Sequence, residues 1–167
     1  MTDDITIPVG NYTFAGVKGY FNTPGGKRLS AFGQFEMGSF FDGKRMTFSV
    51  QPLYVLAKDL NLTGYYQINW VDFPSRDQSL LAHITRLKLE ATLSLKFTAT
   101  AFVQYNSAAD AVIANIRLRF NPREGNDLYI VYNENLNTNR GRYSPFKTYS
   151  SGRAIMIKYS HTFKLND

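Results

Sequence analysis

Hydrophobic and polar residues alternate one by one along most of this chain, most clearly between residues 111 and 135. From 112 to 120 the even-numbered residues are apolar, and the odd-numbered ones include Asn115, Arg117 and Arg119. Residues 121–126 then carry Pro122 and Gly125, where a chain reversal needs one fixed and one permissive backbone angle. Alternation resumes over 127–133. A period of two is typical of strands and not of helices, so this stretch predicts a β-hairpin.

The same alternation recurs along the rest of the chain, and turn-forming residues separate the alternating segments. Besides the hairpin strands at 112–120 and 127–133, strands are expected at 12–21, 28–40, 45–54, 62–71, 81–91, 95–104 and 153–163. Asp42-Gly43 is a strong hairpin signal. Pro52 lacks the amide hydrogen that a central strand needs, so a bulge or a strand end is expected there. No segment shows convincing helical periodicity.

These segments indicate an all-β protein with consecutive antiparallel strands, which is a meander that can close as an up-and-down β-barrel. About eight to ten strands are expected in a single domain over 12–167, preceded by a flexible lead-in over 1–11. The longest irregular stretch, 134–152, is rich in Asn, Ser, Arg and Tyr and is expected to be a loop. No internal repeat and no domain linker interrupts this pattern.

Composition restricts the possible functions. Of 167 residues, 15% are aromatic and only 19% are charged, which is below the roughly 25% of average soluble domains. The net charge is +6, but the basic residues are scattered, so nucleic-acid binding is not expected. The chain has no cysteine, which excludes disulfides and thiolate chemistry. No cofactor is expected, and no metal site is expected because Asp42, Asp72 and Asp110 lie in separate turns.

No apolar run approaches the roughly 18 residues of a membrane helix. This does not argue against a transmembrane β-barrel, whose strands are shorter and less apolar. The N-terminal residues lack the basic and apolar regions of a secretory signal. The chain is thus expected to be either cytoplasmic or a mature or excised piece of a protein, with a new N-terminal Met.

The alternation fits two arrangements. In a soluble barrel the apolar face is the core, and the charged face meets water. In a membrane barrel the apolar face meets lipid, and the charges line the lumen. Strands of about ten residues, aromatic residues near strand ends, and turns that alternate between short and long favour the membrane arrangement.

The membrane arrangement assigns roles to two groups of residues. The charged side chains expected to line the lumen are Glu36, Arg86, Lys88, Glu90, Arg117 and Arg119. The aromatic side chains expected at the membrane interface are Phe40, Tyr54, Trp70, Tyr132 and Phe163. In a narrow barrel the charges would form ion pairs that fill the lumen, whereas in a larger barrel they would set the selectivity of a pore for anionic solutes.

Several motifs resemble a known family. They are GSFFDGKR at 38–45, VDFP at 71–74, RLKL at 86–89, FVQYNS at 102–107, NIRLRF at 115–120, NDLYIVYN at 126–133 and RAIMIKY at 153–159. Together they resemble the C-terminal outer-membrane β-barrel region of large Bacteroidetes proteins that carry an N-terminal family-9-like carbohydrate-binding domain, a family of unknown function. The likeness extends from about Tyr12 onward and implies an outer-membrane location. The sugar-binding domain has no counterpart here, so no carbohydrate-binding residues are implied.

An odd number of strands bears on whether this chain forms a whole barrel or only a part of one. Bacterial barrels usually have an even number of strands with both ends in the periplasm, and a ninth strand breaks this rule. Either 5–9 adds a tenth strand, or one segment does not span, or the chain is part of a larger barrel, in which case other barrel segments are its partners. The last option is favoured.

Catalysis is not expected, although Ser160 and His161 raise the alternative of a lipid-modifying membrane hydrolase. His83 is the only other histidine. A second alternative is a soluble lipocalin-like barrel that binds an apolar ligand. The favoured interpretation is an outer-membrane barrel that anchors or passes solutes, with the lipid bilayer as its partner. The basic loop residues Arg140, Arg142, Lys147 and Arg153, with Tyr143 and Tyr149, are candidates to contact lipopolysaccharide phosphates.

Overall fold

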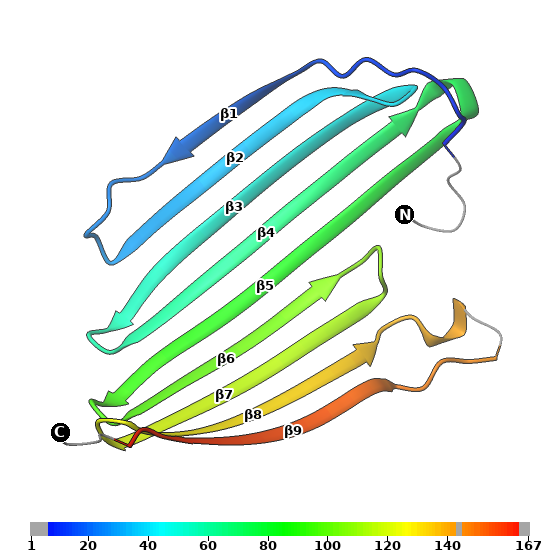
Figure 1. The fold of residues 1–167 in the computed structure, drawn as a ribbon. Coiled ribbons are helices and arrows are strands. Elements are labelled where there is room, and N and C mark those ends of the chain that lie inside the picture. The colour runs from blue at the N-terminus through cyan, green and yellow to red at the C-terminus, as the bar shows by residue number, and fades with distance from the viewer. Residues whose placement is uncertain (1–6, 143–144, 164–167) are drawn as a thin grey trace.

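The computed structural model describes residues 7–142 and 145–163, and their strands form a single sheet. Nine strands pair in chain order, each antiparallel to the next (Figure 1). They are β1 (Gly16–Asn22), β2 (Leu29–Phe40), β3 (Gly43–Ala57), β4 (Leu60–Phe73), β5 (Gln78–Ser94), β6 (Phe97–Asn106), β7 (Ala111–Arg123), β8 (Asn126–Asn137) and β9 (Ser150–His161). The short 3-10 turns η1 (Pro74–Arg76) and η2 (Arg140–Arg142) are the only helical elements in the described residues. The all-β antiparallel meander predicted from the alternation is confirmed.

The sheet curves strongly into a trough, with β1 and β9 as its two edges (Figure 1). Within the described residues no backbone pairing joins β1 to β9, so the sheet is open between them. The connections 41–42, 74–77 and 107–110, and the described parts of the connection between β8 and β9 (138–142 and 145–149), lie at one end of the trough, named here the loop end. The connections 23–28, 58–59, 95–96 and 124–125 lie at the other end, named here the turn end.

Most strands are longer than the alternation predicts, because polar residues at their ends continue the backbone ladder. β5 has 17 residues, against a mode of about 5–6 in globular sheets. The expected turn near Thr92 lies instead at residues 95–96, after a register shift between Thr92 and Ser94. The expected loop over 134–152 is also shorter, because Glu134 pairs with Arg153 in the β8–β9 ladder. An ion pair between these two side chains stabilises the extended pairing.

Pro52 lies inside β3, and the expectation of a bulge or a strand end at this position is wrong. On the β2 side Pro52 stays in register with Ala31. On the β4 side pairs form at Val50 and Leu53 but not between them, and the register is the same on both sides of the gap. The sheet thus accommodates the missing amide hydrogen by omitting one section of a single ladder.

The small buried core lies at the loop end. Among the described residues the buried apolar side chains are Val71, Phe73 and Ala82, and Phe73 is only 1% exposed. The Arg76 guanidinium lies over the Phe73 ring, with 4.1 Å between its Cζ and the ring centroid. Arg76 also donates to Asp42 at 2.7 Å, which ties the turn after β4 to the turn after β2.

Glycines in β1 and β2 make room for aromatic rings from the paired strand. The ring of Phe21 lies over Gly33, and the ring of Phe35 lies over Gly19, so that a Cβ at either glycine would overlap the ring. Each aromatic ring covers backbone that glycine leaves bare, a device that fixes strand register. The β1–β2 pairing thus depends on these two contacts.

We expect Gly33→Ala to destabilise the fold by about 1–3 kcal/mol, because the added methyl group displaces the Phe21 ring. Gly25→Ala is the matched control, since a Cβ there meets nothing within 4 Å. Urea unfolding of the refolded protein measures the free energy, and amide hydrogen exchange locates the loss in β1. Equal stability of the two variants would contradict this account of the register.

Candidate functional site

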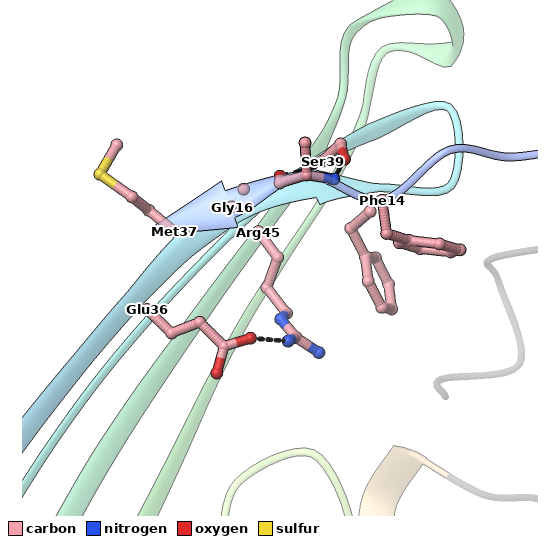
Figure 2. Close-up of a pocket in the computed structure, with 9 residues that line it drawn as sticks. Phe14, Gly16, Glu36, Met37, Ser39 and Arg45 are labelled. Carbon is pink, nitrogen blue, oxygen red and sulfur yellow. Dashed lines mark hydrogen bonds and ion pairs between the residues drawn. The ribbon is translucent and has the colours of Figure 1, made fainter. Parts of the chain in front are cut away.

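The candidate functional surface is the sheet itself, whose two faces differ in chemistry. Paired residues of an antiparallel sheet place their side chains on the same face, so the strand registers define each face. Figure 2 shows Glu36 and Arg45 pointing into the trough and Met37 pointing away from it. The face of Glu36 is named here the concave face, and that of Met37 the convex face.

The convex face carries exposed apolar side chains on all nine strands. The registers connect Val17, Met37, Met46, Trp70 and Leu81 in one row across β1 to β5. Other exposed members of this face are Phe35, Phe48, Leu87, Leu89, Val103, Ile116, Ile130, Ile155, Ile157 and Tyr159. Monomeric soluble proteins rarely expose apolar patches beyond a few hundred Å², so a surface of this extent is typical of a site that contacts another protein, a membrane or an apolar ligand.

Polar residues bound this apolar band on β8 and β9. At the turn end Asn126 pairs with His161, and at the loop end Glu134 pairs with Arg153. Between these rows the convex residues are Leu128, Ile130, Tyr132, Ile155, Ile157 and Tyr159. The chain from Asn126 to Glu134 spans about 26 Å at roughly 3.3 Å per residue. A tilt of about 40° reduces this to about 20 Å, which is comparable to the roughly 25 Å apolar band of outer-membrane barrels.

The predicted interface aromatics do not form one group. Tyr54 and Trp70 lie on the convex face near the turn end and the loop end, respectively. Tyr132 is also convex but lies in the middle of β8, not near a strand end, and it donates to Glu134. Phe163 lies just past β9, in edge-to-face contact with His161.

Phe40 differs from Tyr54, Trp70 and Tyr132 in the face that it occupies, and its interface role stays a prediction. It lies on the concave face, where the Arg45 guanidinium approaches its ring to 5.0 Å from the centroid. Its nearest aromatic neighbours are Phe41 and Phe73. The sequence showed an aromatic residue at a strand end, but the strand register places its ring on the polar side of the sheet.

All six charged residues expected in the lumen lie on the concave face. The registers place Glu36 beside Lys18 and Thr47, and they place Arg86, Lys88 and Glu90 together along β5. Arg117 and Arg119 follow on β7, opposite Thr100 and Thr98. The structure thus brings these residues to one surface, and their role as lumen residues stays a prediction.

Hydrogen bonds and ion pairs connect many of these charges. Glu36 accepts from Arg45, with Lys18 Nζ 3.8 Å away (Figure 2). Lys88 and Glu90 pair at 2.8 Å along β5. Such partly exposed pairs contribute little to stability, so their main effect is to orient the side chains.

Other concave cations lack an acidic partner. Arg86 donates to the neutral Gln104 at 2.6 Å and stacks on Tyr65, with 4.7 Å to the ring centroid. Within the described residues Arg117 makes no hydrogen bond or ion pair, whereas Arg119 pairs with Asp127 at 2.7 Å. Basic residues outnumber acidic ones on this face, which gives it a positive potential.

A polar cluster on the convex face was missed by the sequence analysis. Glu134 is 5% exposed and accepts hydrogen bonds from Arg153 and Tyr132. The Arg153 side chain is 64% exposed and extends over the convex face at the loop end. The sequence signal was a Glu and an Arg among Asn and Ser residues, which is equally typical of a loop.

The structure separates the residues considered for catalysis. Ser160 and His161 are neighbours in β9 and therefore lie on opposite faces of the sheet. His161 interacts with Asn126, and His83 lies 2.9 Å from the Tyr66 hydroxyl. Within the described part of the chain, neither imidazole contacts a serine hydroxyl and a carboxylate. In residues 7–142 and 145–163 no cluster of His, Asp and Glu has the geometry of a metal site.

A shallow pocket lies where the segment before β1 meets β2 and β3 (Figure 2). Phe14, Phe40 and the Glu36–Arg45 pair line it. The Ser39 hydroxyl accepts from the Ala15 amide at 2.6 Å and fixes the segment in place. The pocket is open and its charges already satisfy each other, so it does not indicate a ligand.

Neither the models of known protein families nor characterised proteins match the chain. In the described residues no helix is long and apolar enough to cross a membrane. The resemblance to the Bacteroidetes barrel family therefore stays a prediction.

Loss of Arg153 and loss of Glu134 are expected to affect stability to different extents. Arg153→Met leaves a shielded carboxylate without its cation, whereas Glu134→Gln leaves an exposed guanidinium that reaches water. We expect the first variant to lower the unfolding midpoint clearly and the second to lower it little. Thermal or urea unfolding in detergent measures both, and the double variant Glu134→Gln/Arg153→Met is the control. The opposite order of the two single variants would show that Arg153, not Glu134, is the group that needs its partner.

Proposed function

We propose that this chain forms part of the wall of an outer-membrane β-barrel, with the convex face against lipid and the concave face toward the lumen. The observation that carries the proposal is the distribution of side chains. Large apolar residues are exposed over the convex face, while the charged residues in the middle of the strands, such as Glu36, Arg86 and Arg117, lie on the concave face. Outer-membrane barrels alternate in this way along every strand.

The curvature of the sheet favours this proposal over a soluble barrel. A lipocalin-like protein binds its apolar ligand inside, so its concave face would be apolar. Here the concave face carries Glu36, Arg86 and Arg117, and the apolar face points outward. The hydrolase alternative loses support because Ser160 and His161 lie on opposite faces.

The proposed role is structural anchoring or solute passage. In a barrel of about eight strands side chains fill the interior, and the concave charge network would then act as a plug. In a larger barrel the same face would border an aqueous lumen. The open edges at β1 and β9 favour the larger barrel, in which passage of solutes is the better supported role.

The loop end is the proposed contact with lipopolysaccharide. Arg153 extends over the convex face at the boundary of the apolar band, and Arg140 and Lys147 lie in the adjoining connection. Guanidinium and ammonium groups bind phosphate through charge-assisted hydrogen bonds. Tyr149 is exposed in the same connection, and Tyr143 lies outside the described residues.

We expect the purified chain to require detergent and to fold into micelles with a band that migrates faster on a gel before boiling than after it. The physical reason is that a hydrogen-bonded transmembrane sheet resists unfolding by the gel detergent until it is heated. A chain that is monodisperse in buffer alone and shows no heat-dependent mobility would contradict the proposal.

A pair of neighbouring substitutions tests which face meets lipid. Ile157 is 70% exposed and convex, and Met156 is 52% exposed and concave. Because Ile157 lies midway between the polar rows on β9, Ile157→Arg should destabilise the protein in bilayers by about 2–4 kcal/mol. Met156→Arg, the matched control, should cost much less. Folding titrations with urea in lipid vesicles measure both.

In a soluble protein two exposed positions tolerate arginine within about 0.5 kcal/mol of each other. Equal stability of the Ile157→Arg and Met156→Arg variants would therefore exclude lipid contact at the convex face.

A further inference from the structure

The edges of the sheet carry an inference about what completes the barrel. β1 and β9 are the edge strands, and all eight neighbouring pairs between them are antiparallel. With nine strands in a meander, the first and the last must run in the same direction. Direct closure between them would make one parallel pair in an otherwise antiparallel sheet.

We propose that β1 and β9 are binding edges for an intervening amphipathic strand, or an odd number of such strands, that runs antiparallel to both. An odd number of added strands restores antiparallel pairing at both edges and gives an even total, as in most bacterial barrels. This inference rests on the proposed membrane function, because a bilayer offers no water to the unpaired amide and carbonyl groups of an edge.

The direction of the strands argues against a second copy of this chain as the partner that pairs with β1 and β9. A second chain inserted in the same membrane orientation presents its own β1 and β9 in the same direction as the first. Pairing of β9 with the neighbouring β1 would again be parallel. The occupant is therefore a segment that enters the sheet in the opposite direction.

The side chains of β1 and β9 indicate which residues the added strand needs on each of its faces. Four apolar convex residues of the two edges are more than half exposed, namely Val17, Ile155, Ile157 and Tyr159. On the concave face each edge carries a lysine. Lys18 lies 3.8 Å from Glu36, and Lys158 has no acidic partner within the described residues. The complementary strand thus has apolar residues outward and acidic or polar residues inward.

The ladders extend far enough for such pairing. β9 has 12 residues and contains no proline. The β1 ladder continues beyond the strand itself through the Ser39 amide, which donates to the Ala15 carbonyl, and the Thr23 amide, which donates to the Ala31 carbonyl. A lysine on an edge strand discourages pairing in water, but in a bilayer the unpaired backbone must still be satisfied.

The test adds a tenth strand to the full chain. A copy of residues 126–137 is appended after Asp167 through a turn, because this sequence pairs antiparallel with β9 and carries Asp127 on its concave side. The matched control is the same added strand shifted by one residue, which moves its apolar side chains to the concave face. The chain has no cysteine, so introduced cysteines report edge contacts cleanly.

We expect the ten-strand chain to fold in micelles as a monomer, and a cysteine in the added strand to form a disulfide with Lys18→Cys in most of the molecules. The shifted control should give at least several-fold less of this disulfide. In the nine-strand chain, Lys18→Cys combined with Met156→Cys, Lys158→Cys or Ser160→Cys should give little disulfide within one chain. These three positions share the concave face of β9 and sample three registers.

Two results would overturn the inference. One is an efficient disulfide between β1 and β9 within the nine-strand chain, which indicates direct parallel closure. The other is equal cross-linking by the shifted control. Failure of the proposed function has a different appearance, because the chain would then be monodisperse without detergent and neither form would insert into micelles.

Discussion

The backbone hydrogen-bond ladder is the interaction on which the rest of this structure depends. Each strand is hydrogen-bonded to its neighbours in chain order, and buried apolar side chains are few among the described residues. A globular protein of this size normally relies on a packed core, whereas here the described residues bury only Val71, Phe73 and Ala82 among apolar side chains. The ladder needs surroundings in which exposed apolar side chains are not penalised, and this requirement connects the fold to the proposed location.

The convex and concave faces of the sheet differ in the polarity of their side chains. The convex face presents side chains of low polarity, interrupted at the loop end by the Glu134–Arg153 pair. The concave face holds cations through a mixture of ion pairs, neutral hydrogen bonds and aromatic contacts, with Arg86 against Gln104 and Tyr65 as the clearest case. Because several concave cations have no acidic neighbour, the inner surface keeps a positive potential.

Sequence and structure agree where one local rule governs, and they differ where contacts between distant residues decide. Alternation correctly placed Arg117 and Arg119 on the face opposite Ile116, because the side-chain direction of a strand follows from residue parity. It did not reveal that β8 and β9 extend through Glu134 and Arg153, because this pairing joins residues that lie 19 positions apart in the sequence. The expected Asp42-Gly43 turn is shifted as well. Phe41 adopts the positive φ of 53°, and its ring packs against Tyr12 and Phe40.

The sequence by itself determined the strands, their order and the separation of apolar from charged residues, since all three follow from a period of two and short connections. Only the tertiary structure decided which face is outside, because the sign of the sheet's curvature cannot be read from alternation. It also placed Phe40 among the inward-facing residues and left β1 and β9 as open edges. The physical reason is that curvature and edge pairing are properties of the whole sheet, whereas alternation is a property of each strand.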